Sequence, residues 1–216
     1  NEHNELKTKF IRNISSQMEP TLNTLGTSAK ELSAQAPRYA EQMQAQVAAL
    51  KQFSDNIQEL SSLENSLTEP YEMGEVNAGT FCESVMEKAK EFIKPDVTPS
   101  VNAPKLQVKT NKEQLERILL YLLKNAAFYT EQGRISLDFK KRGAHTHQFI
   151  ITDTGTGIPA EQQENLFKPF TQVKDLTTGD GLGLPICSLI ATKMNGSLTL
   201  DTSYTKGCRF ILELHA

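Results

Sequence analysis

The residues best suited to chemistry lie in a short segment, Asp-Thr-Gly-Thr-Gly-Ile-Pro, at residues 153–159. One threonine separates it from an apolar run at residues 149–151, which is typical of a buried strand. A carboxylate at a strand end, next to Gly155 and Gly157, would let a flat heterocycle lie against bare backbone and donate an amino group to Asp153. Taken alone, the pattern also fits a tight turn with a solvated aspartate.

A second glycine-bearing segment, Gly-Asp-Gly-Leu-Gly-Leu-Pro-Ile-Cys, covers residues 179–187. Its three glycines precede an expected helix, so free N–H groups and the positive end of the helix dipole could face an anion. The glycine spacing differs from that of the dinucleotide fingerprint, and three glycines alone are weak evidence. The polar stretch between the two segments, residues 165–180, has the length of a functional lid or a disordered loop.

A third candidate group is the amide of Asn125, which lies among mostly apolar neighbours at residues 122–130. A buried amide must be satisfied by hydrogen bonds. Its oxygen could ligate Mg²⁺, which takes hard oxygen donors and bridges to phosphates. The alternative is an ordinary hydrogen bond to the backbone.

The elements that must position these groups alternate between helices and strands over residues 70–216. Helices are expected at 81–93, after a cap at Asn111, and at 182–193. Strands are expected at 98–103, 106–109, 134–142, 148–152, 198–202 and 208–214, the first of them broken by Pro99. Mostly hairpin-linked strands with interspersed helices predict an α+β domain, an α/β sandwich with one sheet and its helices on one face.

Residues 1–69 have a different, helical pattern. An apolar stripe recurs every three or four residues up to Leu32, and a break follows at residues 34–37. Two heptad series then begin at Met43 and Phe53. The pattern predicts an antiparallel helical hairpin that would pair with a second copy into a four-helix bundle. A plain spacer coiled coil is the alternative.

Composition excludes several functional classes. The net charge of −3 gives no basic surface, so we expect no nucleic-acid partner. Three separated cysteines fit neither a disulfide framework nor a metal cluster and favour a reducing compartment. The longest apolar run, residues 118–123, is far shorter than the roughly 20 residues of a membrane span, so no membrane contact is expected. The chain opens on Asn1, and we interpret it as a fragment of a longer protein.

The order of the motifs resembles one known family. Asn125 on a helix, then residues 153–159, then Leu-Phe-Lys-Pro-Phe at 166–170, then residues 179–186 resemble the N, G1, F and G2 boxes of the sensor histidine kinase ATP-binding domain. The hairpin, with Phe-Ile-Arg-Asn-Ile-Ser-Ser-Gln-Met-Glu-Pro-Thr-Leu at 10–22, resembles the dimerisation and phosphoacceptor domain of these kinases. The resemblance therefore implies two domains, at 1–69 and 70–216.

The resemblance also implies a role for each matching position. Asp153 would take the adenine amino group, Gly155 and Gly157 would let the base approach, and Asn125 would hold Mg²⁺ against the phosphates of ATP. Residues 165–180 would form a lid over the nucleotide. The remaining implied ATP-binding residues are Ile158, Phe170, Lys174, Thr177, Thr178, Gly181, Leu182, Gly183 and Leu184. Family members pass the γ-phosphate to a His on the first hairpin helix and then to the receiver domain of a response regulator.

The acceptor site departs from the family pattern. Aligned on residues 13–15, the acceptor His falls on Ser16 and the adjacent acid, the general-base position, falls on Gln17. Ser16 lies about 200° round the helix from Ile14 and Met18, so its position faces away from the hairpin seam. A serine hydroxyl needs a general base, and an amide cannot act as one. Autophosphorylation on the usual His is therefore not expected.

Two further positions also differ. Tyr121 and Phe128 stand where family members often carry a second Asn and a phosphate-facing cation, which would weaken nucleotide binding.

The departures at the acceptor site favour natural divergence over engineering. One engineered change at Ser16 would not also explain Gln17 or the inverted order of residues 20–21.

Two functions remain open at this stage. The first is the homodimeric, cytoplasmic kinase core of a larger membrane-anchored two-component sensor, with ATP and Mg²⁺ as cofactors and a response regulator as partner. The second is a pseudokinase that acts as a dimeric signalling relay without catalysis. A chaperone-type or mismatch-repair ATPase is disfavoured because those proteins lack the hairpin.

Overall fold

The computed structural model describes residues 2–34, 36–169 and 181–215. They fall into two units by their internal contacts. The first comprises residues 1–66 and 166–186, and the second comprises residues 67–165 and 187–216.

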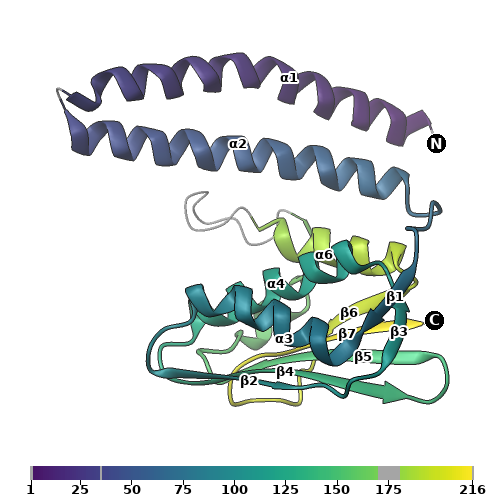
Figure 1. Cartoon of the computed structure of the whole chain (residues 1–216). Helices are drawn as coiled ribbons and strands as arrows, with labels where there is room; N and C mark the ends of the chain where they lie inside the picture. Colours follow the sequence, from purple (N-terminus) through teal and green to yellow (C-terminus); the bar gives the residue numbers. More distant parts are fainter. Residues whose placement is uncertain (1, 35, 170–180, 216) are drawn as a thin grey trace. The chain divides into compact units, whose positions relative to one another are not determined.

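The first unit contains the predicted hairpin. Helix α1 (Glu2–Glu31) is followed by the short 3₁₀ helix η1 (Leu32–Ala34), and α2 (Pro37–Asn65) returns alongside α1 (Figure 1). Pro37 begins α2, a position where the missing N–H of proline costs no hydrogen bond. Pro20 lies inside α1, and the helix continues through it.

The seam between α1 and α2 contains small residues as well as the expected apolar residues Leu22, Ala29 and Leu60. Ser15, Leu22 and Ala29 are buried at seven-residue spacing on α1, and Ala40, Ser54 and Ser61 are buried at multiples of seven on α2. In contrast, the expected stripe residues Ile14, Leu25 and Leu32 are 40–42% exposed in the single chain. Small side chains let the two helices approach closely, which leaves the larger apolar side chains at the flanks of the contact.

The second unit contains a five-stranded sheet in the order β2-β4-β5-β7-β6. Its strands are β2 (Val97–Asn102), β4 (Gly133–Arg142), β5 (Thr146–Asp153), β6 (Gly196–Leu200) and β7 (Arg209–His215). Strand β2 runs parallel to β4, and the other neighbours are antiparallel. Pro99 is tolerated because β2 lies at the edge of this sheet.

A separate two-stranded sheet corrects the prediction of one sheet. Strand β1 (Gly74–Asn77) pairs antiparallel with β3 (Gln107–Thr110). Strand β1 has no alternating pattern that would predict it, because Val76 is its only buried residue.

The helices of this unit cover one face of the larger sheet. Helices α3 (Ala78–Ala89), η2 (Lys90–Phe92) and α4 (Lys112–Tyr129) precede the central strands, and α5 (Ala160–Gln163) and α6 (Gly183–Lys193) follow β5. Asn77 and Asn111 cap α3 and α4 by accepting N–H hydrogen bonds from Thr80 and Gln114. Five residues of α4 pack at 0–1% exposure beneath the sheet: Leu115, Ile118, Leu119, Leu122 and Leu123. The α+β class is thus confirmed.

Candidate functional site

Asp153 ends strand β5, where its carboxylate is almost fully buried. The residue is 4% exposed. Its Oδ1 accepts hydrogen bonds from the N–H of Gly155 at 2.9 Å and from the N–H of Cys208 at 3.2 Å. Oδ2 has no hydrogen-bond partner among the residues that the structure describes. Burial raises the pKa of Asp153, and the two backbone hydrogen bonds oppose this shift.

The end of α4 closes on the loop that follows Asp153. The carbonyl oxygen of Tyr129 accepts a hydrogen bond from the N–H of Thr156 at 3.2 Å. A Cβ at position 155 would lie 2.4 Å from that oxygen and 2.8 Å from Oγ1 of Thr130. Gly155 is therefore required by the close approach of two backbone segments, independently of any ligand.

Two other glycines lie in the loop and the turn that border Asp153. Gly157 has φ +72° and Gly207 has φ +149°, conformations that favour glycine. A Cβ on Gly207 would lie 2.1 Å from the carbonyl oxygen of Asp153. The carboxylate is thus bordered by bare backbone from the 155–157 loop and from the turn before β7.

Polar and aromatic residues of α4 lie next to this loop. Asn125 is half-buried, and its amide forms no hydrogen bond within the described part of the chain. It precedes Tyr129 by four residues, about 6 Å along the helix axis. The rings of Phe128 and Tyr129 are 62% and 54% exposed and meet edge to face at 4.9 Å between centroids. The family pattern marks Phe128 as the position of a missing cation, whereas no sequence feature pointed to Tyr129.

Comparison with known proteins agrees with this arrangement. Residues 110–216 match the family described as "Histidine kinase-, DNA gyrase B-, and HSP90-like ATPase". This half of the chain belongs to that ATPase family. Asp153, Gly155, Gly157 and Asn125 all lie inside the matched region.

Two of the relatives that the chain matches are sensor kinases. The chain is 26% identical over 224 residues to the aerobic respiration control sensor protein ArcB of Escherichia coli K12. This match covers 97% of this chain and 29% of ArcB. It is 34% identical over 127 residues to the sensor histidine kinase RcsC of Salmonella typhimurium, covering 57% of this chain and 13% of RcsC. The chain thus spans less than a third of the length of these relatives.

A solved structure supports the fold of both units. Full-length ShkA, crystallised with AMPPNP, superposes with a TM-score of 0.75 at 22% identity, covering 96% of this chain and 46% of that one. At this identity the likeness shows the fold. The recognition of a sensor histidine kinase core, a hairpin followed by an ATPase domain, is therefore confirmed.

The second glycine motif of the ATPase domain lies at the start of α6. Gly181 has φ +68°, and Leu182 is fully buried and accepts the helical hydrogen bond from the N–H of Ile186 at 2.9 Å. Gly183 begins α6, and Leu184 is half-buried. Residues 181–186 belong to the first unit, whereas Asp153 belongs to the second. A single site formed by both glycine motifs stays a prediction.

The other predicted nucleotide contacts have varied outcomes. Ile158 is half-buried, and its carbonyl oxygen accepts a hydrogen bond from Nε2 of Gln163 at 2.8 Å. The predicted lid contacts Phe170, Lys174, Thr177 and Thr178 lie outside the described residues.

The described residues could share the coordination of Mg²⁺ with a nucleotide, but they do not form a site that encloses the ion by itself. No group of three or more His, Cys, Asp or Glu side chains within the described ranges could hold a metal ion. Mg²⁺ usually keeps several waters and takes one or two protein oxygens together with nucleotide phosphates. The amide oxygen of Asn125, for which the described part of the chain offers no hydrogen-bond donor, is compatible with that mode.

The acceptor position of the hairpin is solvent-exposed. Ser16 lies on the exposed side of α1 within the single chain, whereas Ser15 is 4% exposed. Gln17 belongs to α1, but its side chain lies outside the described part. Pro20 cannot donate the helical hydrogen bond to the carbonyl oxygen of Ser16.

One histidine of the sheet is buried. His147 is 7% exposed on β5 and stacks on Phe139 at 5.8 Å between ring centroids. It alternates with less buried residues and lies on the buried side of the strand together with Phe149 and Ile151. Burial lowers the pKa of His147, with Lys141 and His145 adding to the effect.

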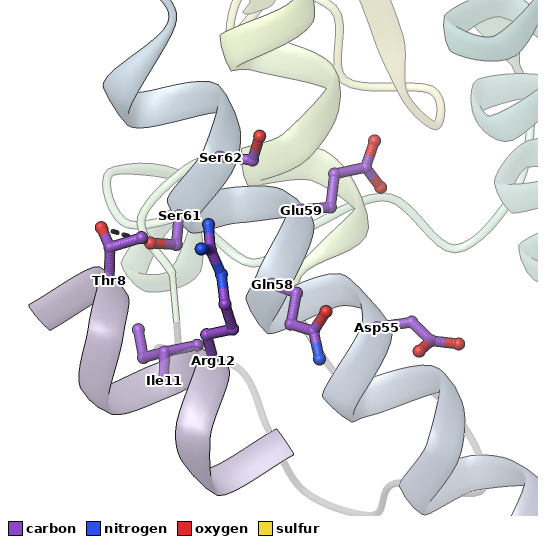
Figure 2. A pocket seen from close by; sticks show the side chains of 8 residues that line it. All are labelled: Thr8, Ile11, Arg12, Asp55, Gln58, Glu59, Ser61 and Ser62. Carbon is purple, nitrogen blue, oxygen red and sulfur yellow. Dashed lines mark hydrogen bonds between the residues drawn. The ribbon is translucent and has the colours of Figure 1, made fainter. Parts of the chain in front are cut away.

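A polar groove of 410 Å³ lies in the hairpin, but it contains none of the predicted nucleotide contacts (Figure 2). Arg12 of α1 extends into it toward α2, and Ser61 donates a hydrogen bond to Oγ1 of Thr8 at 3.0 Å across the two helices. Asp55 and Glu59 of α2 also line it.

Among the described residues, no helix has the length and apolar character needed to cross a membrane.

Proposed function

We propose that this chain is the kinase core of a two-component sensor histidine kinase and that it binds ATP together with Mg²⁺. The observation that carries the proposal is Oδ2 of Asp153: it accepts no hydrogen bond from the described residues, and it belongs to a buried residue that is bordered by glycine backbone. An adenine amino group could donate to Oδ2 while the flat base lies against the 155–157 loop. Tyr129 is bonded to this loop through its carbonyl oxygen, and its exposed ring would offer an aromatic surface on which a base can stack.

The phosphates require other residues. Asn125 would hold Mg²⁺, which neutralises phosphate charge and orients the γ-phosphate when it is bound. Gly181, Leu182 and Gly183 would offer backbone N–H groups at the start of α6 to the phosphates. Lys174, Thr177 and Thr178 would add contacts from the lid, with Ile158, Phe170 and Leu184 as apolar neighbours.

The hairpin would act as the dimerisation element. Ile14, Leu25 and Leu32 are 40–42% exposed in the single chain, which supports pairing with a second copy in a four-helix bundle. The partner downstream would be the receiver domain of a response regulator. The chain would be the cytoplasmic part of a longer, membrane-anchored sensor.

Phosphoryl transfer would need an acceptor other than the chain's own α1. Ser16 occupies the acceptor position without an imidazole, and Gln17 occupies the general-base position without a carboxylate. The γ-phosphate would therefore pass to a His elsewhere, either on another domain or on a partner subunit that carries one.

A second candidate function is a non-catalytic relay. It is favoured by Ser16 and by Phe128, whose exposed apolar ring stands where a phosphate-facing cation is expected. A pseudokinase of this type would dimerise and bind a regulator or another kinase without chemistry.

Nucleotide titration separates the two candidates. The whole chain is titrated with a fluorescent ATP analogue, with and without Mg²⁺, and then incubated with γ-labelled ATP. Saturable binding below millimolar concentration supports the nucleotide-binding core, and its absence leaves only the relay. Acid-stable label on Ser16 would contradict its assignment as an inert position.

A further inference from the structure

The turn between β6 and β7, residues 201–208, is tied to Asp153 at several atoms. The hydroxyl of Tyr204 donates a hydrogen bond to the carbonyl oxygen of Asp153 at 3.2 Å. The N–H of Asp153 donates to the carbonyl oxygen of Cys208 at 2.9 Å, and the N–H of Cys208 donates to Oδ1 of Asp153 at 3.2 Å. Gly207 lies against the same carbonyl oxygen of Asp153. Main chain and side chain of Asp153 are thus held by one turn.

Arg209 fixes the ring of Tyr204. The guanidinium carbon lies 4.2 Å from the centroid of that ring, a cation–π contact. Nη1 of Arg209 pairs with Oδ2 of Asp201 at 3.3 Å, and its Nε donates to Oγ1 of Thr152 at 3.2 Å. Arg209 therefore connects both ends of the turn to the strand that carries Asp153.

The carboxylate of Asp201 is oriented by hydrogen bonds within the 201–208 turn. Its Oδ1 accepts hydrogen bonds from the N–H of Ser203 at 3.0 Å and from the hydroxyl of Ser203 at 2.5 Å. These bonds, followed by the neighbouring Arg209, lower the pKa of Asp201, so its carboxylate remains charged opposite the guanidinium. The N–H of Tyr204 donates to the carbonyl oxygen of Asp201 at 3.2 Å and closes the turn.

We propose that Tyr204 is a positioning residue for base recognition: its hydroxyl anchors the 201–208 turn to Asp153, so that the N–H of Cys208 holds Oδ1 and leaves Oδ2 directed to the base. This inference rests on the proposed nucleotide function. Oδ1 is held from two sides, by the 155–157 loop and by this turn. Without the hydroxyl, the hydrogen bonds between Asp153 and Cys208 are the remaining ones that join the turn directly to Asp153 among the described residues.

The test variant is Tyr204→Phe in the whole chain, because it keeps the ring beneath Arg209 and removes only the hydroxyl. The dissociation constants of adenosine, ADP and ATP are expected to rise by a common factor of about 3 to 10, the effect of one lost hydrogen bond. The three ligands carry the same base and differ in their phosphates. A common factor therefore indicates an effect on binding of the base, whereas an effect on phosphate contacts would differ among them. Tyr39→Phe, at a tyrosine 69% exposed on α2, is the matched control and should change none of them.

A second readout does not depend on nucleotide. The carboxyl group of Asp153 is titrated by NMR in the parent chain and in the variant. The hydrogen bond from Cys208 lowers the pKa of Asp153, so its loosening in Tyr204→Phe should raise that pKa. A purely structural tyrosine would lower the melting temperature and leave both this pKa and the three dissociation constants unchanged.

The outcomes are separable. Unchanged affinities and an unchanged Asp153 titration overturn the role of Tyr204. A parent chain that binds no nucleotide overturns the proposed function, and the titration then decides the role of Tyr204 alone. If Tyr204→Phe does not fold, Arg209→Lys keeps the hydroxyl and loosens the ring, and it should raise the pKa of Asp153; no change there overturns the inference.

Discussion

Replacing Asp153 by Asn tests base recognition while leaving the buried geometry almost intact. The amide oxygen of Asn can take the place of Oδ1 and still accept from the N–H groups of Gly155 and Cys208. The amide NH₂ then takes the place of Oδ2, so a donor faces the adenine amino group where an acceptor stood. A hydrogen bond to a charged group contributes about 1.5–3 kcal/mol, which corresponds to a factor of about 10 to 150 in affinity.

The expected stability change is much smaller. Burial raises the pKa of Asp153, so the folded chain bears a cost for holding this charge at neutral pH, and the neutral amide removes that cost. The two N–H hydrogen bonds become weaker in exchange. We expect the free energy of unfolding of Asp153→Asn to stay within about 1 kcal/mol of the parent, measured by urea denaturation.

Isothermal titration with ATP and ITP makes the prediction specific. ITP carries a carbonyl oxygen in place of the adenine amino group, so it should bind the Asn variant relatively better and narrow or reverse the preference for ATP. Asp96→Asn, at an exposed aspartate, is the matched control and should bind like the parent. An Asp153→Asn variant that binds ATP as tightly as the parent would refute the role of Oδ2.

Three further predictions follow from the same geometry. Gly155→Ala places a Cβ 2.4 Å from a carbonyl oxygen and should cost about 1–3 kcal/mol in urea denaturation and weaken ATP binding, whereas Gly74→Ala, with nothing within 4 Å, should change stability by less than about 0.5 kcal/mol. Because the pKa of Asp153 is raised, ATP affinity should fall on acidification with a midpoint above the ordinary value of 3.8. The stability of the parent relative to Asp153→Asn should be greatest below pH 3.8 and should decrease as pH rises through the raised pKa. An affinity and a relative stability that do not change with pH would contradict these expectations. Ser16→His should yield an acid-labile, base-stable label from γ-labelled ATP that the parent lacks; nucleotide binding without label would show that an imidazole at this position is not enough.

Local chemistry predicted much of the fold. The cap at Asn111 and the apolar face of α4 were both legible because each depends on neighbours within a few residues. Pro99 was compatible with a strand only at a sheet edge, which is where β2 lies. Strand β1 was missed because its pairing with β3, not its own pattern, makes it a strand.

The candidate site was predictable only in part for the same reason. Asp153 and the two glycines after it are one segment, so their chemistry could be inferred from spacing. Cys208 and Tyr204, however, lie more than 50 residues away and reach Asp153 through the pairing of β5 with β7. The buried position of His147 likewise depends on which face of β5 meets the helices.

Base recognition and phosphoryl transfer depend on different residues of this chain, so one can be lost without the other. Asp153 is held by backbone hydrogen bonds inside one unit, and none of those bonds involves the hairpin that carries Ser16. A chain that retains the first and lacks the second can still be stabilised by nucleotide, because any ligand that binds only the folded state does so. Combining Ser16→His with Asp153→Asn separates the two contributions. At ATP concentrations that saturate the single Ser16→His variant, the double variant should lose the label that the histidine restores. The label should return when the ATP concentration is raised by the factor by which Asp153→Asn weakens ATP binding. Label that persists unchanged in the double variant would mean that phosphoryl transfer does not use the nucleotide held at Asp153.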